Sequence, residues 1–400
     1  MSEVKLSPVE LAHLLTPVAI REKARAVFAL TCSGDGAFGY HEEQLRPAVD
    51  FVMTVIRENY PDGNIPFHSR WGHFRAGAVD RVALLKPQLA GLEPLERARV
   101  MLDLVITSVL LDAGAGAEWS YTEASTNRSF ARSEGLGVAS YHMFLSGIMS
   151  GDGKSLRADA KGLKSVSIAD LQQHFQVGAR NPLLGVEGRV ALLNGLARAL
   201  ENGKRFKGGR PGNIIDFLIE KYGRVIPATG ILSAVLGGFG AIWPGRLSAG
   251  GVGLGDVWRH SRLGLVPLHK LSQWMTYSLI EPLVEAGLEV KGVEELTGLA
   301  EYRNGGFLID IGLLTLKDAS AMTRKWRPES DLIIEWRALT VYLLDVLGTE
   351  VQKALGKTPA EFPLAKVLEG GTWWAGRKIA RAKRVSGEPP LAIESDGTVF

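Results

Sequence analysis

Hydrophobic side chains recur at helical spacing along most of this chain. The clearest pattern runs over residues 330–347, where one face of the predicted helix carries Leu332, Trp336, Leu339, Leu343 and Leu347. Comparable spacing predicts further helices over 18–30, 46–60, 98–111 and 268–281. The chain is therefore predicted to fold mainly as α-helices.

Local signals indicate where some of these helices begin and end. Ser167 followed by Asp170 forms a capping-box pattern, which predicts a helix start within 165–175. The helix over 268–281 is expected to stop at Pro282, because proline has no backbone N–H to donate.

The stretch 225–245 contains no charged residue and is about as long as a membrane-spanning helix. Pro227, Pro244 and several glycines interrupt it. We therefore expect a buried helix at 228–236 followed by a glycine-rich turn, and no membrane association. No secretory signal is visible in residues 1–10, which contain charges and no apolar run.

Strand patterns are few and short. Segments 118–123 and 128–132 flank a polar turn and predict a β-hairpin. A second hairpin is predicted from 391–395 and 398–400 around Asp396-Gly397. Residues 246–257 indicate a glycine-rich ribbon. The predicted architecture is therefore mainly α, with a few small β-hairpins, folded as one compact unit.

The composition is that of a globular protein with a large core: of 400 residues, 46% are hydrophobic and 22% are charged. Lys and Arg number 46 against 43 Asp and Glu, and this net charge of +3 is too small to indicate a nucleic-acid-binding protein. The single cysteine, Cys32, excludes an internal disulfide and predicts a reducing, cytoplasmic location.

Two patterns that resemble cofactor or metal sites lack the required context. The glycines of 34–39 match G-x-G-x-x-G, but a helical pattern rather than a strand precedes them, so a loop between helices is expected. His68 and His73 are not spaced to share one helix face. We therefore expect neither a cofactor nor a metal; the alternative is a zinc site built from His68, His73, His260 or His269.

Glu335 falls on the apolar face of the helix predicted over 330–347. A carboxylate in that position needs a partner or shifts its pKa. Arg303 and Arg337 are the candidate partners in a structural ion pair, and a functional role is the alternative.

His269 and Lys270 stand at the expected start of a helix, just after Pro267. Cations there oppose the helix dipole, unless an anion binds between them and the free N–H groups. Lys270 is therefore a candidate anion-binding residue, and a solvated lysine is the alternative.

Polar groups are also concentrated in three other segments. Residues 301–306, Glu-Tyr-Arg-Asn-Gly-Gly, place an acid, a phenol, a guanidinium and an amide beside two glycines that let a ligand approach the backbone closely. His68, Arg70 and Asp112 lie in polar inserts beside apolar helices. Each segment is predicted to line a pocket or to form a structural turn.

These segments resemble the uracil catabolism protein 4 family. The resemblance covers almost the whole chain and is carried by segments 65–71, 110–118, 130–134, 243–247, 255–260, 269–280, 299–306, 335–340, 366–373 and 395–400. The family is named for a route of pyrimidine degradation in fungi and bacteria, which runs through uridine monophosphate and ribosylurea toward urea. The resemblance implies a place in that route rather than a particular reaction.

A more distant resemblance implies the reaction. Three motifs, in the same order, are similar to the queuosine 5′-phosphate N-glycosidase (queuine salvage) family: Lys270-Leu271-Ser272-Gln273, Glu301-Tyr302-Arg303 and Glu335-Trp336-Arg337. That family is α-helical, is related to helical DNA glycosylases, and releases a base from a ribose 5-phosphate. It has Asp where this chain has Glu301, and residues 304–306 depart from its pattern.

Together the resemblances imply one helical domain over 1–400, with an N-terminal part at 1–95 and a glycosidase-like core at 96–400. They imply an N-glycosidase that hydrolyses ribosylurea 5′-phosphate, a nucleotide-like substrate, to urea and ribose 5-phosphate. Two alternatives stay open: another hydrolase of a ureido or nucleotide intermediate in the same route, and a non-catalytic helical partner of a pathway enzyme.

On this hypothesis Glu301 is the carboxylate that stabilises positive charge on the sugar and deprotonates the attacking water. Lys270 contacts the phosphate or the leaving group, with Arg303 beside it, and Tyr302 caps the pocket. Asp112 and Glu335 are candidates for the ribose hydroxyls or the ureido N–H groups. The predicted substrate-binding set also includes His68, Arg70 and His269.

Overall fold

The computed structural model describes residues 3–202, 205–243 and 246–394, and this part of the chain is mainly α-helical, as predicted. The longer helices are α2 (Pro17–Cys32), α3 (Leu45–Asn59), α6 (Pro94–Leu110), α7 (Arg132–Leu145), α10 (Val186–Asn202), α12 (Ala228–Phe239), α13 (Lys270–Glu285), α15 (Asp331–Leu355) and α17 (Trp373–Lys383). The shorter ones are α1 (Pro8–Leu14), α4 (Arg70–Phe74), α5 (Arg81–Leu85), α8 (Ala160–Ser165), α9 (Ile168–His174), α11 (Ile214–Tyr222), α14 (Tyr302–Asp310) and α16 (Leu364–Val367).

The strands of the described part are short and pair two by two. The antiparallel pairs are β1 (Phe38–Tyr40) with β10 (Leu314–Leu316), β2 (Ser120–Glu123) with β3 (Arg128–Ala131), β5 (Ser248–Ala249) with β6 (Val252–Gly253), and β7 (Val257–His260) with β8 (Gly264–Pro267). The parallel pairs are β4 (Val225–Pro227) with β9 (Glu289–Lys291), and β11 (Lys325–Trp326) with β12 (Ala392–Ile393).

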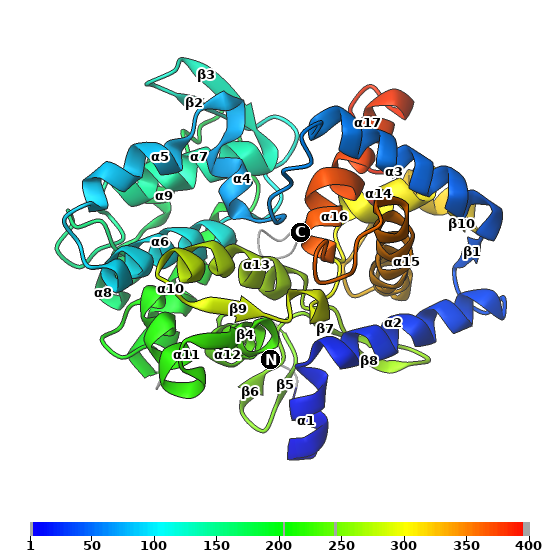
Figure 1. The fold of residues 1–400 in the computed structure, drawn as a ribbon, viewed down its shortest axis with the longest axis horizontal. Helices are drawn as coiled ribbons and strands as arrows, with labels where there is room; N and C mark the ends of the chain where they lie inside the picture. Colours follow the sequence, from blue (N-terminus) through cyan, green and yellow to red (C-terminus); the bar gives the residue numbers. More distant parts are fainter. Residues whose placement is uncertain (1–2, 203–204, 244–245, 395–400) are drawn as a thin grey trace.

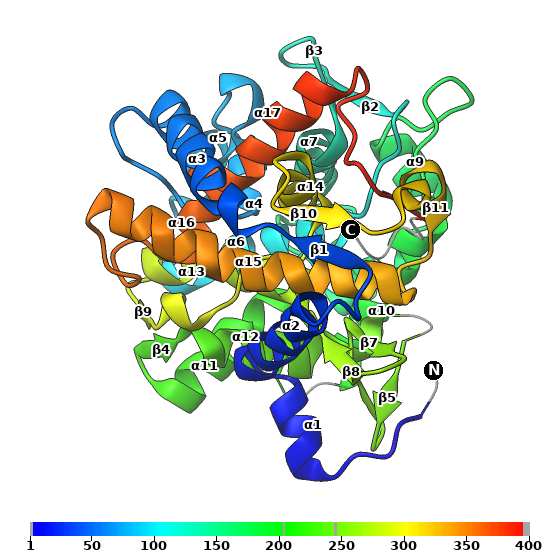
Figure 2. The ribbon, with the colours of Figure 1, turned by 90° about the vertical axis from the view of Figure 1, so that its right-hand side faces the viewer.

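Two hydrophobic cores lie next to each other along the long axis of the molecule (Figure 1). The first core is formed mainly by α4–α7, α10, α12 and α13, and the second by α2, α3, α14, α15 and α17. Figure 2 shows α15 crossing the middle of the molecule, with α2 packed along it. Helices from residues 1–95 contribute to both cores, α4 and α5 to the first and α2 and α3 to the second.

Helix α15 confirms the clearest amphipathic pattern and extends it by two turns. Leu339, Leu343 and Leu347 are completely buried, so the predicted apolar face is the face that packs in the second core. The helix ends at Leu355 because Gly356 adopts a left-handed conformation (φ +65°), which stops the helical hydrogen-bond pattern.

Helix α13 continues past Pro282, where the sequence predicted an end. Proline donates no hydrogen bond, and so it leaves the carbonyl of Ser278, one turn earlier, without its usual helical partner. The indole Nε1 of Trp71, on α4, donates to this carbonyl at 2.7 Å. A tertiary contact therefore supplies the hydrogen bond that the helix lacks, and the helix runs on to Glu285.

Two other local predictions are confirmed. The capping box at the start of α9 is present, with the Ser167 hydroxyl accepting from the Asp170 N–H and the Asp170 carboxylate accepting from the Ser167 N–H. The helix expected at 228–236 is α12, and most of its side chains are buried. Among the described residues, no helix combines the length and the apolar character that crossing a bilayer would require.

The hairpin predicted from 118–123 and 128–132 is the β2–β3 pair, and the ribbon at 246–257 contains the β5–β6 pair. The C-terminal hairpin is different. Residues 395–400, which would form its second half, lie outside the described residues. Ala392–Ile393 instead pair in parallel with Lys325–Trp326, a partner far away in the sequence that no local pattern could indicate.

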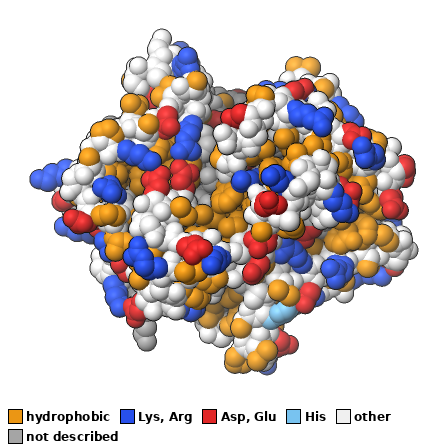
Figure 3. Space-filling model, in the orientation of Figure 1, with side chains coloured by type: hydrophobic (Ala, Val, Ile, Leu, Met, Phe, Trp, Pro, Cys, Tyr) orange, Lys and Arg blue, Asp and Glu red, His pale blue; other side chains and the backbone are white. Residues whose placement is uncertain are grey.

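Positive and negative side chains are mixed on the surface, as the small net charge of the sequence leads one to expect. On the face drawn in Figure 3, Lys and Arg side chains are interspersed with Asp and Glu, and hydrophobic side chains lie between them. Ion pairs such as Lys86–Glu285 and Lys378–Glu58 connect opposite charges that lie far apart in the sequence.

The role assigned to Trp71 predicts a coupling with Pro282. Trp71→Phe should lower the free energy of unfolding by about 1–3 kcal/mol, partly because the Ser278 carbonyl stays buried without a donor. In a Pro282→Ala background, the helix N–H of residue 282 can donate to that carbonyl, and the penalty of Trp71→Phe should be smaller. Urea unfolding of the four proteins in this double-mutant cycle measures the difference; equal penalties in both backgrounds would contradict the assignment.

Candidate functional site

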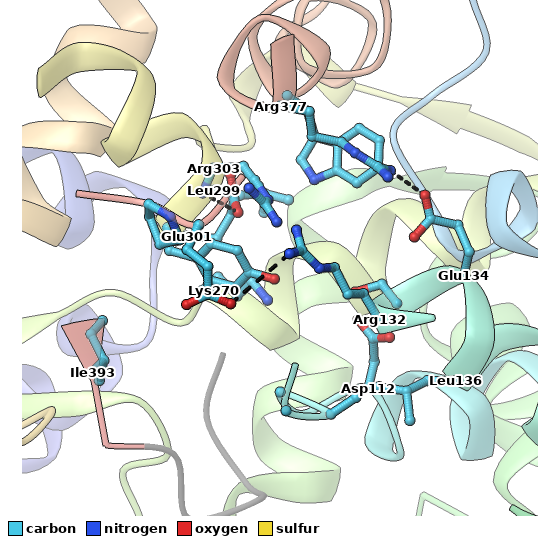
Figure 4. Close-up of a pocket in the computed structure, with 18 of the residues that line it drawn as sticks. Asp112, Arg132, Glu134, Leu136, Lys270, Leu299, Glu301, Arg303, Arg377 and Ile393 are labelled. Carbon is cyan, nitrogen blue, oxygen red and sulfur yellow. Dashed lines mark hydrogen bonds and ion pairs between the residues drawn. The ribbon is translucent and has the colours of Figure 1, made fainter. Parts of the chain in front are cut away.

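A cavity of about 320 Å³ lies where the two cores meet. Its volume suits a small molecule. Of the residues predicted from the sequence, it brings together His68, Asp112, Lys270, Glu301, Tyr302 and Arg303. Figure 4 shows Lys270, Glu301 and Arg303 on one side of this space and Asp112, Arg132 and Glu134 on the other.

Glu301 is the N-cap residue of α14. One of its carboxylate oxygens accepts a hydrogen bond from the N–H of Arg303 at 2.7 Å, and the other accepts from the N–H of Asn304 at 2.6 Å. These two bonds fix the direction of the carboxylate at the start of the helix. Each oxygen keeps a second lone pair that can face a ligand.

Lys270 is the first residue of α13 and is 9% exposed. Burial lowers the pKa of Lys270, although Asp112 and Glu301 act in the opposite direction. No carboxylate of the described residues lies within 4.0 Å of its Nζ, which lies 5.7 Å from the centre of the Trp274 ring. The ammonium group is thus held in the cavity without a direct ion-pair partner from the described chain.

The anion expected at the start of this helix is supplied by the protein. Asp256 accepts a hydrogen bond from the backbone N–H of Lys270 at 2.9 Å and two more from the Arg337 guanidinium, both at 2.8 Å. Burial disfavours the charge on Asp256, but Arg337 outweighs it and holds the pKa of this carboxyl well below its usual range. The sequence prediction missed Asp256, since nothing near it along the chain indicates a helix cap.

Asp112 lines the cavity, and Arg70 lies behind it. The Arg70 guanidinium donates to Asp112 Oδ1 at 2.6 Å and to the hydroxyl of Ser108 at 2.6 Å, and it is completely buried. Burial raises the pKa of Asp112, although Arg70 and Lys270 favour its ionised form. Arg70 therefore orients Asp112 and is not part of the cavity lining, whereas Asp112 Oδ2 accepts no hydrogen bond from the described residues.

Several cations of the cavity were not predicted. Arg132 and Arg377 join Arg303 in the lining, and Figure 4 shows Arg132 extending toward the wall that carries Lys270 and Glu301. Arg377 pairs with Glu134. The segment 130–134 and the region before Arg377 were noticed only for their resemblance to a family, and no local pattern marks either arginine as functional.

The C-terminal segment covers part of the cavity. Arg303 donates to the carbonyl of Gly387 at 2.7 Å, and Arg132 donates to the carbonyl of Ser386 at 3.0 Å. Residues beyond this point, from Glu388 to Ile393, contribute to the lining. Two cations that face the cavity thus also hold the segment that closes it.

Glu335 and His269 lie outside the cavity lining. Glu335 accepts a hydrogen bond from the backbone N–H of Ala37 at 2.7 Å and lies 3.2 Å from Nε2 of His260, a partner that replaces the expected arginine. A Cβ atom at Gly36 would lie 2.9 Å from the Glu335 carboxylate, so the glycine-rich loop allows this close approach. The loop joins α2 to strand β1 rather than to a second helix.

His269 has a left-handed backbone conformation (φ +47°), and its Nε2 lies 3.1 Å from the carbonyl of Leu14. Burial lowers the pKa of His269, so the ring is neutral near pH 7 and does not add a cation to the helix start. Within the described residues, no group of three or more His, Cys, Asp or Glu side chains is arranged to hold a metal ion.

Comparison with known proteins gives matches over nearly the full length. The model of a family described as "Protein of unknown function (DUF1688)" matches residues 13–400. Uracil catabolism protein 4 of Lachancea kluyveri is 38% identical, over 96% of this chain and 97% of the relative. Protein urg3 of Schizosaccharomyces pombe is 39% identical, over 99% of this chain and 100% of the relative. The resemblance to the uracil catabolism protein 4 family is therefore confirmed, and the chain belongs to the family described as DUF1688.

Proposed function

We propose that this protein acts in uracil catabolism as an N-glycosidase, and that it hydrolyses ribosylurea 5′-phosphate to urea and ribose 5-phosphate. The name of the Lachancea relative supports the pathway, and the motifs shared with the queuosine 5′-phosphate N-glycosidase family support the reaction. The observation that carries the proposal is one cavity that holds an oriented carboxylate, Glu301, an unpaired ammonium, Lys270, and several guanidinium groups.

The carboxylate suits the charge that develops in this reaction. When the C1′–N bond of a riboside breaks, the ring becomes positively charged, as in the oxocarbenium-like transition state of glycoside hydrolysis. Two backbone N–H groups hold the Glu301 carboxylate in a fixed direction, so it can stabilise this charge without reorganising. Its remaining lone pairs can accept the proton of the attacking water. The water oxygen adds to C1′, and the bond electrons leave with the ureido nitrogen.

The cations suit a phosphate. Lys270, Arg132 and Arg303 line the cavity, and guanidinium groups bind phosphate oxygens in pairs. A phosphate bound here fixes the distant end of the substrate, so that binding energy is used to position C1′ against Glu301. Asp112, whose Oδ2 accepts no hydrogen bond from the described residues, is suited to a ribose hydroxyl.

The direct test is to incubate the purified protein with ribosylurea 5′-phosphate and to measure the products by mass spectrometry. Equimolar urea and ribose 5-phosphate are expected, in the presence or absence of a chelator. Ammonia or a carboxylic acid in their place would point to another hydrolase of the same route. A thermal shift without turnover would show that the protein binds this compound but does not hydrolyse it.

Glu301→Gln should lower kcat by roughly 10²–10⁴-fold, because the amide carries no charge and is a poor base. It should also cost about 1 kcal/mol of stability, since Glu301 caps α14. Glu301→Asp is the matched control: it keeps a carboxylate and a cap, and it should retain more activity than Glu301→Gln. Steady-state kinetics and thermal unfolding measure both effects. A folded Glu301→Gln protein with near-wild-type turnover would refute the assignment.

Lys270→Ala should raise the KM for ribosylurea 5′-phosphate by roughly tenfold or more and change kcat less, because a phosphate contact contributes similarly to the ground state and the transition state. The effect should disappear with ribosylurea, which has no phosphate. Lys86→Ala, at an exposed ion pair, is the control. A collapse of kcat with an unchanged KM would assign Lys270 to the leaving group instead.

A further inference from the structure

One wall of the cavity carries a hydrogen-bonded chain of three side chains. The Tyr60 hydroxyl donates to Glu369 Oε1 at 2.9 Å, and Glu369 Oε2 lies 2.7 Å from Nδ1 of His68. His68 is 4% exposed and lines the cavity. Burial, together with the charge of Glu369, raises the pKa of Tyr60, so its hydroxyl stays protonated and acts as the donor.

This chain fixes which nitrogen of His68 is available. An ionised carboxylate only accepts hydrogen bonds, so Nδ1 must carry a proton toward Glu369. Nε2 is then the ring atom that remains for the cavity, and none of the described residues forms a hydrogen bond with it. The backbone N–H of His68 donates to the carbonyl of Ala365 at 2.8 Å, which fixes the position of the residue itself.

The local fold holds Glu369 in place. It lies in a π-helical turn, Leu368–Thr372, between α16 and α17, and turns of this kind are frequent at functional sites. A Cβ atom at Gly371 would lie only 2.6 Å from Val52 on α3, so the turn packs closely against that helix. Tyr60 follows directly at the end of α3. Elements far apart in the sequence therefore converge on one histidine.

Flat aromatic rings surround His68. The centre of the His68 ring lies 5.4 Å from that of Trp373. A second histidine–tryptophan pair lines the same cavity, with 5.6 Å between the ring centres of His73 and Trp274. Trp274 Nε1 and His73 Nδ1 are buried and have no hydrogen-bond partner among the described residues, although both residues line the cavity. Buried polar atoms usually have partners, and two flat rings with unpartnered nitrogens in one lining suit a planar, polar occupant.

His68 and His73 differ in the charged groups that surround them. Burial lowers the pKa of His73 far below its usual value, and Arg70, His68, Arg377 and Lys270 act in the same direction. His73 is therefore neutral. His68, in contrast, has the carboxylate of Glu369 at 2.7 Å from its Nδ1, whereas Nδ1 of His73 has no described partner.

We propose that this wall binds the leaving group and that His68 is the catalytic acid, with Glu369 and Tyr60 as positioning residues. The inference rests on the N-glycosidase function proposed above. In the acid form of His68 both ring nitrogens carry a proton. As the C1′–N bond breaks, its electron pair moves to nitrogen, which takes the proton from Nε2, and His68 becomes neutral with its Nδ1 proton still directed to Glu369. Water adds to C1′ and gives a proton to Glu301, which then releases it to solvent, while His68 takes up a proton from solvent. Urea leaves neutral, whereas its anion would be a very poor leaving group.

The kinetic test compares two leaving groups. His68→Gln should lower kcat on ribosylurea 5′-phosphate by roughly 10²–10⁴-fold. On 4-nitrophenyl riboside 5-phosphate, whose leaving group departs without a proton, the loss should stay within about tenfold. Glu301→Gln should lose activity on both substrates, because it acts on the sugar. His41→Gln, at an exposed histidine outside the cavity lining, is the matched control and should change neither rate.

A separate measurement tests the positioning role of Glu369. Nitrogen-15 NMR of labelled histidine should show that the neutral ring of His68 keeps its proton on Nδ1 in the wild type. Glu369→Gln should weaken this preference and lower kcat on the ureido substrate only. Tyr60→Phe, which leaves the carboxylate in place, should have the smaller effect. An unchanged His68 spectrum in Glu369→Gln would overturn the positioning role.

The outcomes distinguish this inference from the proposed function. Equal losses on both substrates in His68→Gln, with an active wild type, would overturn the acid role and leave the N-glycosidase intact. No loss on either substrate would remove His68 from the reaction. A wild type that turns over neither substrate would overturn the proposed function, and the acid role with it.

Discussion

The arrangement of the cavity depends on one buried ion pair, between Asp256 and Arg337. The Asp256 carboxylate accepts from the backbone N–H of Lys270, and Nε of Arg337 donates to the carbonyl of Ala300. The pair thus fixes the first residue of α13 and the residue that precedes Glu301. Lys270 stands at the start of α13 and Glu301 at the start of α14. The Asp256–Arg337 ion pair therefore holds both of these helix starts in position.

The same pair connects the two cores. Arg337 belongs to α15, in the second core, and Lys270 belongs to α13, which packs in the first. A charge buried without a partner costs several kcal/mol, whereas the bidentate geometry here satisfies both groups. Because the cavity lies where the cores meet, any change that separates Asp256 from Arg337 also alters the spacing across the site. The geometry of the site is therefore tied to the packing of the whole molecule.

The buried polar groups of the protein fall into two kinds. Some are engaged mainly with the chain: Arg70 orients Asp112 through Nη1, and Glu335 binds His260 together with the backbone at Ala37. Others keep a polar atom without a hydrogen-bond or ion-pair partner among the described residues, as do Nε1 of Trp274 and Nζ of Lys270. Both of these residues line the cavity, whereas other buried atoms without a described partner, such as Nδ1 of His269, lie outside it. An unsatisfied polar atom is therefore informative at the site only because it faces the same cavity as the charged groups of Lys270 and Glu301.

Much of the fold and part of the candidate site could be predicted from the sequence. The apolar face of α15, the capping box of α9 and the buried helix α12 depend on residues a few positions apart, whose geometry is nearly the same in any helix. The dense polar turn at 301–306 and the lysine at a helix start were recognised for the same reason: their unusual character is local.

Tertiary structure decided everything that depends on partners distant in sequence. His68 and Glu369 are 301 positions apart, and Asp256 and Arg337 are 81 apart, so no local pattern pairs them. Helix α13 passes Pro282 only because Trp71 supplies a donor from another helix. Glu335, which the sequence offered as a substrate contact, became a structural residue once α15 packed against His260 and the loop at Ala37. Periodicity reports which face of a helix is buried, but only the packed chain determines which groups that face meets, because hydrogen bonds and ion pairs need partners within a few ångströms in space.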